Sequence, residues 1–469
     1  MNLYLNKDLS EIKVFLFLLV FQITSIILLG LEYFKEAIVI SLIFIACLGL
    51  LYPMLNVLIL AFISLAIEGK LIENFILFRF LGFNWYLMDV AFFLVIVNLI
   101  LMSKNSLENL IFDRTFAAVL VFLLVALYSV YNGLKNGHQF QGVFYDFRGF
   151  FYYLTFVPAI IYLNSKNKII TFLFFVLVII SLKSLVDIYF SLFVYEKTFD
   201  IESRQILGFA RLTGYNEIVY SLSFIGAFFM FFLSNKFFDK IFAVLVFVIS
   251  AFALFLSYTR GSWVAAVMTI LVGIIFLVFS KGSKIKLKNV FISFLLLSLF
   301  FVILHLINLI NLEVLWKRLQ TISIYSIDIS NLGRLVEYAS ALEAFRTNPI
   351  SGTGLGYLFV YFSPGIGTVE SIYCHNSYLY ILSKMGIIGI IPFILLIIFA
   401  LYPLLKIRKF VFYDYFYSIS FILLLILLSI VIKSFTTWHL NTNTFSLFVG
   451  ILFGVSIRIR DFLIKDYGR

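Results

Sequence analysis

Four basic residues lie in the segments that connect the apolar runs of this chain. His375 opens HNSYLY, Arg211 opens RLTGYNE, Arg260 lies in SYTRGSW and Arg334 lies in NLGRLVEY. A guanidinium group stays charged and binds two phosphate oxygens at once, whereas an imidazole titrates near neutrality and can take a proton from a hydroxyl group. Three guanidinium groups around one imidazole therefore indicate group transfer from a pyrophosphate to a hydroxyl, with His375 as general base.

Three further residues are candidates for contacts to the acceptor or within the loops: Asn376, His439 and Arg148. The sequence contains no Asp-x-Asp, no His-Glu-x-x-His and no Cys/His cluster with the spacing of metal ligands. It therefore predicts a reaction without a metal ion and without a cofactor.

The composition is that of an integral membrane protein. Hydrophobic residues make up 63% of the chain and charged residues 13%, whereas about a quarter of the residues of a soluble domain are charged. Apolar runs long enough to approach a membrane span lie at residues 14–30, 37–51, 53–67, 85–102, 115–131, 150–163, 169–194, 217–233, 240–257, 263–279, 290–310, 377–404, 416–434 and 442–457. The fold class predicted is an all-α polytopic membrane protein with about 12 to 14 transmembrane helices.

One long polar stretch divides the chain into three parts. Residues 1–310 are expected to form about eleven transmembrane helices with short loops, residues 311–376 one large periplasmic loop with short amphipathic helices, and residues 377–469 the last transmembrane helices and a cytoplasmic tail. Because a charged segment kept among so many spans needs a reason, we expect the chemistry to take place in this loop.

The distribution of lysine and arginine predicts the orientation. If both termini lie in the cytoplasm, the cytoplasmic short loops carry more Lys and Arg than the opposite ones, as the positive-inside rule requires. The candidate arginines and His375 then lie outside the cytoplasm. The net charge of +11 is spread over these short loops without an aromatic-rich basic patch, so it reflects topology and does not predict nucleic-acid binding.

Two local patterns predict structure within and around the large loop. Residues 334–347 have apolar or small residues at helical spacing, which predicts an amphipathic helix on the membrane surface, with an apolar face formed by Leu335, Tyr338, Ala339, Leu342 and Phe345. The glycines of GTGLGY, residues 352–357, indicate tight backbone turns and not a phosphate-binding loop, because no Lys-Ser/Thr follows them.

Charges within the apolar runs are few. Lys183 and Asp187 are four residues apart on one helical face and are expected to neutralise each other. A transport pathway would need more such groups on several helices. The cysteines, Cys47 and Cys374, lie in a span and in the loop, so no disulfide between them is expected.

From residue 255 to residue 392 the chain resembles the superfamily of O-antigen ligases and polymerases, which are bacterial membrane glycosyltransferases. The resemblance lies in SYTRGSW, in GRLVEYASALEAFRTNPISGTGLGY and in HNSYLYILSKMGIIG, where His375-Asn376 precedes a nine-residue gap and Gly386-x-x-Gly389. Arg211 in RLTGYNE resembles an upstream element of the family. Lys384 departs from the pattern, since related sequences more often carry an acidic or neutral residue there, and this leaves the acceptor less defined than the donor.

The resemblance implies metal-independent, inverting transfer of a glycan from undecaprenyl pyrophosphate at the periplasmic face of the bacterial inner membrane. It implies His375 as the general base and Arg211, Arg260 and Arg334 as pyrophosphate ligands. The expected partners are the undecaprenyl-pyrophosphate-linked glycan donor, membrane lipids, and either lipid A-core or a lipid-linked glycan as acceptor.

Several functions remain open at this point. The leading one is an O-antigen ligase that transfers the glycan to a sugar hydroxyl of lipid A-core. A polymerase of the same superfamily would use a second lipid-linked repeat unit as acceptor. A lipid or glycan transporter also remains open, and so does a glycosyltransferase with Glu32 or Glu36 as its base.

Overall fold

A computed structural model describes residues 48–66, 76–80, 83–102, 114–191, 205–206, 209–210, 217–280, 302, 305–306, 316, 319–320, 329–363 and 367–468. Arg211, Glu32, Glu36 and Cys47 lie outside these residues, as do most of the runs 14–30, 37–51 and 290–310. The total of 12 to 14 spans and the three-part division therefore stay predictions.

Helices make up most of the described chain, and they follow the apolar runs of the sequence. The helices are α3 (Met54–Ala66), α5 (Leu87–Met102), α6 (Arg114–Lys135), α7 (Phe140–Phe151), α8 (Phe156–Tyr162), α9 (Lys166–Tyr189), α10 (Ile218–Leu233), α11 (Phe237–Leu256), α12 (Arg260–Val278), α15 (Ile329–Thr347), α16 (Ser377–Ile407), α17 (Tyr415–Lys433) and α18 (Asn443–Tyr467). Six of the described helices, namely α6, α9, α11, α12, α16 and α17, are long and apolar enough to cross a membrane. This confirms the all-α polytopic membrane fold.

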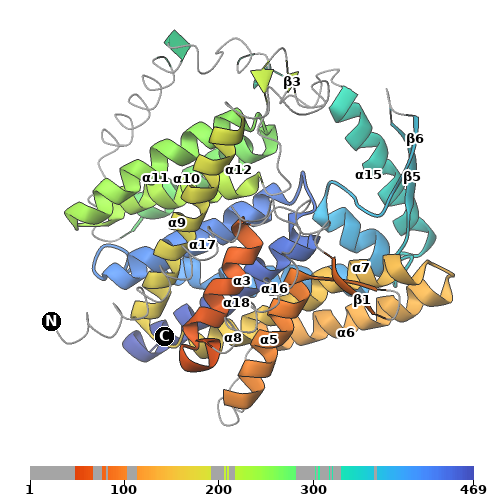
Figure 1. Cartoon of the computed structure of the whole chain (residues 1–469), viewed down its shortest axis with the longest axis horizontal. Helices are drawn as coiled ribbons and strands as arrows, with labels where there is room; N and C mark the ends of the chain where they lie inside the picture. Colours follow the sequence, from red (N-terminus) through yellow and green to blue (C-terminus); the bar gives the residue numbers. More distant parts are fainter. Residues whose placement is uncertain are drawn as a thin grey trace.

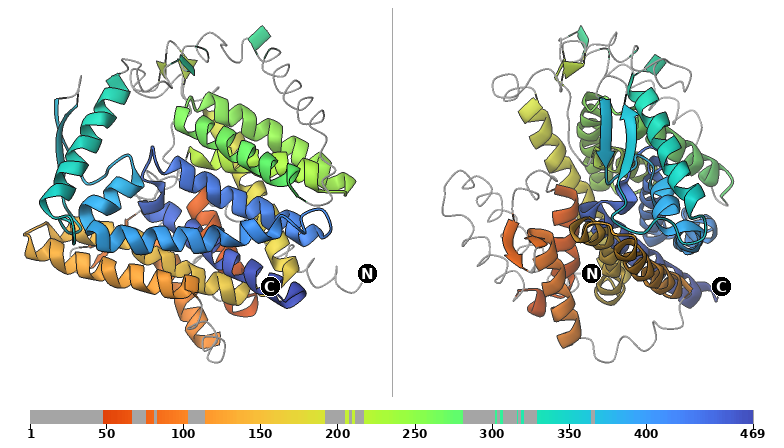
Figure 2. Two further views of the ribbon diagram at one scale, coloured as in Figure 1. Left: turned by 180° about the vertical axis from the view of Figure 1, so that it is seen from behind. Right: turned by 90° about the vertical axis from the view of Figure 1, so that its right-hand side faces the viewer.

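The helices pack into two neighbouring groups (Figure 1). Helices α9, α10 and α12 pack on α17, with α11 against α9 and α10, while α3, α8 and α16 pack on α18, with α6 against α16. Helix α15 and a hairpin formed by β5 (Phe359–Ser363) and β6 (Gly367–Ser371) stand at one end of the bundle beside α6 and α7, as both views of Figure 2 show. The described strands form three two-stranded hairpins, of which the other two are β1 (Ile76–Phe80) with β2 (Phe83–Tyr86) and β3 (Gln205–Ile206) with β4 (Phe209–Ala210).

The run at residues 150–163 is not one straight span. Helix α7 ends at Phe151, a 3-10 turn η3 covers Tyr152–Thr155, and α8 follows. Pro158 has no N–H group to donate to the carbonyl of Leu154, so the chain cannot continue the α-helical bonding pattern through this point. The break lets the Thr155 hydroxyl donate to the carbonyl oxygen of Leu447 on α18 at 2.8 Å.

Segments that were predicted to share one side of the membrane meet at the same end of the bundle. At one end, Lys166 forms ion pairs with Asp466 at 2.6 Å and with Asp414 at 3.5 Å. At the other end, Asn132 in the last turn of α6 and Asn136 directly after the helix donate to carbonyl oxygens of the GTGLGY segment. This grouping agrees with the predicted alternation of loops. Which end faces the cytoplasm stays a prediction.

The predicted helix within the large loop is present as α15, but a different face of it is buried. Glu337, Ala341 and Ala344 are buried, whereas Leu335 is 49% exposed and Leu342 is 39% exposed. The small alanine side chains let α15 lie close to β5, where the Ser340 hydroxyl donates to the carbonyl oxygen of Val360. The leucine face stays available for the predicted contact with lipid. The hairpin β5–β6, with Phe359 opposite Ser371, was not predicted.

The GTGLGY segment forms tight backbone turns, as its sequence indicated. Gly352 and Gly354 have φ values of 67° and 92°, which residues with a side chain rarely adopt. A Cβ atom on Gly352 would lie 2.3 Å from the carbonyl carbon of Lys384, and one on Gly354 would lie 2.3 Å from the amide nitrogen of Gly133. The glycines therefore allow the loop to pack directly on the backbones of α16 and α6.

Charged side chains within these helices form ion pairs with each other. Lys183 and Asp187 of α9 lie 2.9 Å apart, which confirms their predicted neutralisation. Lys384 of α16 lies 2.6 Å from Asp146 of α7, and both side chains are 0% exposed. The Lys384 ammonium also donates to the carbonyl oxygen of Ile372 at 2.8 Å, so this residue joins α16, α7 and the segment that leads to His375.

We predict that Lys384→Met lowers the free energy of unfolding by about 3–5 kcal/mol, because it leaves the Asp146 carboxylate buried without its partner. The double variant Lys384→Met/Asp146→Asn removes both charges and keeps an acceptor, so it should recover much of the loss. Thermal unfolding in detergent measures both effects. Equal stability of Lys384→Met and the unsubstituted protein would contradict this account.

Candidate active site

His375 is held from two directions by the carboxylate of Glu337. The backbone N–H of His375 donates to Oε1 of Glu337 at 2.9 Å, and the imidazole Nδ1 lies 2.8 Å from Oε2. The Glu337 side chain is 2% exposed, while that of His375 is 37% exposed. Because a carboxylate only accepts hydrogen bonds, Nδ1 carries the proton in this pair. The Nε2 atom of a neutral ring is then the one able to accept a proton from a substrate.

Aromatic side chains complete the surroundings of His375. The ring of Trp438 lies 4.5 Å from the imidazole ring, and it stacks on Tyr373 with a centroid distance of 4.8 Å. The Tyr338 hydroxyl donates to the carbonyl oxygen of His375 at 3.0 Å. The backbone and the ring of His375 are therefore both fixed by contacts with other segments.

Asn376 fixes the start of α16 directly after His375. Its side-chain oxygen accepts hydrogen bonds from the backbone N–H groups of Tyr378 and Leu379, each at 3.0 Å. This is an ordinary helix N-cap. The Ser377 N–H donates to the carbonyl oxygen of Ser434 at 2.9 Å, which ties the same turn to the end of α17. Any contact between Asn376 and an acceptor stays a prediction.

His439 lies in the segment between α17 and α18, and its side chain is buried. It opens the short 3-10 helix η6 (His439–Asn441) and is 5% exposed. Burial, with smaller contributions from the charges of Lys433 and His375, lowers its pKa to about 3. The ring is therefore neutral at physiological pH, and its Nδ1 atom has no hydrogen-bond partner among the described residues. Whether it contacts an acceptor stays a prediction.

Arg334 lies on the same helix as Glu337, one turn earlier. Burial raises the pKa of the Tyr338 hydroxyl to about 12, and the positive charge of Arg334 opposes this rise. Arg334 thus shares α15 with the carboxylate that binds His375. Its role as a pyrophosphate ligand stays a prediction.

Arg260 opens α12, and the start of this helix packs against the end of α17. A Cβ atom on the next residue, Gly261, would lie 2.6 Å from the ammonium of Lys433 and 2.5 Å from the Thr436 hydroxyl. The end of α17 also adjoins the turn after His375, since the Ser377 N–H donates to the carbonyl oxygen of Ser434. Arg260 and Lys433 therefore lie at the end of the bundle that carries His375. Arg211 lies outside the described residues.

Arg148 occupies a different position from these cations. Its guanidinium lies 3.5 Å from Asp89 of α5 and donates to the carbonyl oxygen of Asn84 at 2.9 Å. The side chain is buried and lines a cavity beside α7. It is therefore part of a neighbouring pocket and not of the group formed with Arg334.

Glu337 and Trp438 were missed in the sequence. Glu337 lies three residues after Arg334, which places both on one side of a predicted helix, and this spacing could have identified it. Trp438 precedes His439 in TTWHLN, and no sequence pattern relates its position to that of His375. Within the described part of the chain, no group of three or more His, Cys, Asp or Glu residues is placed to hold a metal ion. Metal independence stays a prediction.

Comparison with known families supports the resemblance seen in the sequence. The model of a family described as O-Antigen ligase matches residues 245–394, about a third of the chain, from α11 to the first half of α16. This match confirms the resemblance to the superfamily of O-antigen ligases and polymerases, and it covers Arg260, Arg334, Glu337 and His375. With the spanning helices, it supports a multi-pass bacterial membrane protein of the glycosyltransferase kind. A search among curated proteins gives no match.

The environment of Cys374 predicts an unreactive thiol. Burial, and next the charge of Glu337, raise the pKa of Cys374 to about 12, so almost no thiolate forms near neutral pH. In a Cys47→Ser background, we expect no maleimide labelling of the folded protein in detergent and full labelling after denaturation. Adding Thr368→Cys, on the exposed hairpin, should restore labelling of the folded protein. Rapid labelling of Cys374 before unfolding would contradict the described burial.

Proposed function

We propose that this protein is an O-antigen ligase-type glycosyltransferase. It moves a glycan from undecaprenyl pyrophosphate to a sugar hydroxyl of lipid A-core, with inversion at the anomeric carbon and without a metal ion. The observation that carries the proposal is the buried Glu337 carboxylate bound to both the backbone and the imidazole of the partly exposed His375, within the segment that matches the O-Antigen ligase family.

In the proposed reaction, Nε2 of His375 removes the proton of the acceptor hydroxyl. The hydroxyl oxygen forms a bond to the anomeric carbon while the bond from that carbon to the pyrophosphate oxygen breaks, and undecaprenyl pyrophosphate leaves as the anion. Glu337 keeps the ring oriented and stabilises the imidazolium that forms. A general base of this kind contributes about 10² to 10⁴ in rate.

The leaving pyrophosphate gains negative charge as the bond breaks, and positive side chains offset this charge. Arg334 and Arg260 are the proposed ligands, together with Arg211 from the sequence pattern. Lys433, which packs beside the start of α12, is an additional candidate. Because the donor is already activated, the protein needs only to orient the substrates, remove one proton and stabilise the leaving group.

The proposed location is the bacterial inner membrane, with both termini in the cytoplasm and the active site facing the periplasm. The excess of Lys and Arg in the loops assigned to the cytoplasm supports this orientation. A periplasmic site would meet a lipid-linked donor without any need for a nucleotide.

The second candidate is a polymerase of the same superfamily, which the family match supports equally. Its chemistry is the same, and only the acceptor differs. Cells without a ligase accumulate long glycan on the lipid carrier, whereas cells without a polymerase make single-repeat products. A transporter would form no glycosidic bond in a reconstituted system with purified donor and acceptor.

We expect His375→Ala to lower kcat by about 10²-fold or more, because the acceptor hydroxyl loses its base. The protein should still insert into membranes, but its thermal stability should fall, because the buried Glu337 carboxylate keeps its bond to the backbone N–H at position 375 and loses the imidazole. Reconstitution with purified donor and acceptor measures the transfer. Transfer at the unsubstituted rate by this variant would rule out His375 as the base.

We expect Glu337→Gln to lower kcat by about 10-fold or more, because the carboxylate no longer orients the imidazole and no longer stabilises the imidazolium that forms. An amide oxygen can accept from the His375 backbone or from Nδ1, but a single glutamine cannot serve both as the two carboxylate oxygens do. KM values should change little. The matched control is Glu343→Gln on the exposed part of α15, which should leave kcat unchanged. Equal kcat values for the two variants would contradict the role of Glu337.

A further inference from the structure

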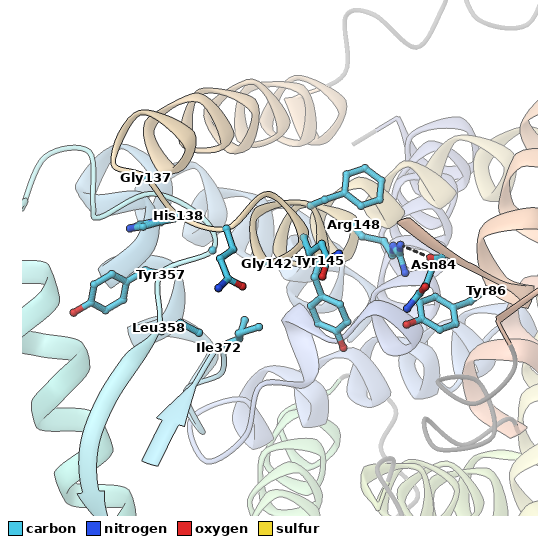
Figure 3. Close-up of a pocket in the computed structure, with 14 residues that line it drawn as sticks. Asn84, Tyr86, Gly137, His138, Gly142, Tyr145, Arg148, Tyr357, Leu358 and Ile372 are labelled. Carbon is cyan, nitrogen blue, oxygen red and sulfur yellow. Dashed lines mark hydrogen bonds between the residues drawn. The ribbon is translucent and has the colours of Figure 1, made fainter. Parts of the chain in front are cut away.

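The cavity that Arg148 lines lies beside the segment that leads to His375. It has a volume of about 530 Å³, within the usual range of small-molecule sites. Figure 3 shows its walls as a row of side chains, from His138 and Tyr357 past Tyr145 to Arg148 and Tyr86. The walls come from the β2 strand, α7 with the turn before it, and the end of the GTGLGY segment.

The lining of this cavity consists of aromatic rings and side-chain amides. Tyr86, Tyr145 and Tyr357 supply aromatic surface, while Gln139 and Gln141 supply amide groups on exposed positions at the start of α7. Tyrosine combines an apolar ring face with a polar hydroxyl. Amides both donate and accept hydrogen bonds, as neighbouring hydroxyl groups of a sugar do. A sugar ring, with apolar C–H faces and a polar edge, matches this combination.

The charge in the cavity wall is already compensated. Among the described lining residues, Arg148 is the one with a formal charge, and the opposite charge of Asp89 lies 3.5 Å from its Nε atom. Its guanidinium also lies over the rings of Tyr86 and Phe144, at 4.9 and 5.3 Å from their centroids. Arg148 therefore holds the wall together, and an uncharged ligand fits this cavity better than a phosphate group does.

A continuous set of aromatic contacts links the cavity to His375. The hydroxyl of Tyr373 donates to that of Tyr145, which lines the cavity. Tyr373 stacks on Trp438, and Trp438 contacts the ring of His375. Ile372, also in the lining, is three residues before His375, so fully extended chain between them spans at most about 11 Å. A glycan bound in the cavity can therefore extend to the histidine.

We propose that this cavity is a saccharide subsite, which binds an uncharged sugar unit of a glycan substrate next to the unit that reacts. The proposal rests on the proposed function, in that His375 marks the reacting end of the glycan. Binding a neighbouring sugar in a preformed cavity would orient the reacting hydroxyl or anomeric carbon relative to the base. The neutral sugar that binds in the cavity can belong to either the acceptor or the donor glycan.

The first test measures binding without turnover. Purified full-length His375→Ala protein is titrated with two probes by calorimetry: the core oligosaccharide released from lipopolysaccharide by mild acid, and the repeat-unit oligosaccharide released from the lipid-linked donor. We expect saturable binding of one probe, at least 10-fold weaker after Gln139→Ala/Gln141→Ala or after Tyr357→Leu. The matched control is Phe140→Leu, in the same turn of α7 but outside the lining, which should not change the affinity.

Binding of neither probe, or unchanged binding by both lining variants, would overturn the subsite. Because the histidine is absent from these proteins, this result is independent of whether His375 is the base. A protein that binds the saccharide but shows no transfer when His375 is present would instead contradict the proposed function alone.

The second test assigns the source of the sugar. In reconstituted transfer, the lining variants should raise KM by at least 10-fold for one substrate. A rise for the acceptor assigns the subsite to the acceptor glycan, and a rise for the donor assigns it to the donor glycan. Unchanged KM for both substrates would contradict the proposal.

Discussion

The arrangement of the candidate site depends on the burial of one carboxylate. The Glu337 side chain is 2% exposed, and a buried charge is costly unless hydrogen bonds and a partner compensate it. The compensation comes from His375, through its backbone N–H and its ring. This requirement fixes α15 relative to the segment before α16. It also leaves the outer nitrogen of the imidazole free for a substrate.

Contacts with the membrane helices also hold the segment around His375 in position. The Lys384–Asp146 pair joins α16 to α7, and the lysine holds the carbonyl of Ile372, three residues before His375. The N-cap of Asn376 and the bond from Ser377 to Ser434 fix the turn that follows. The loop that carries the proposed base is thus supported on both sides by helices, as an accurate catalytic geometry requires.

Hydropathy alone predicted the membrane fold and the places of most described helices, because a helix in lipid must satisfy its own backbone and present about 20 apolar residues. The residues His375, Arg260 and Arg334 could be proposed from their motifs. Glu337 could have been noticed from its helical spacing to Arg334, but its pairing with His375 could not be predicted, because the two residues are 38 positions apart and the pairing depends on how α15 folds back onto the bundle. The burial of the opposite face of α15 and the hairpin after it are likewise products of tertiary packing.

The most direct test of the central claim is a double-mutant cycle on kcat between Glu337 and His375, in reconstituted transfer with saturating donor and acceptor. If the carboxylate acts through the imidazole, Glu337→Gln should have little further effect once His375 is replaced by Ala, so the double variant should match His375→Ala. A double variant whose loss equals the product of the two single losses would show that the residues act independently, and would contradict this account.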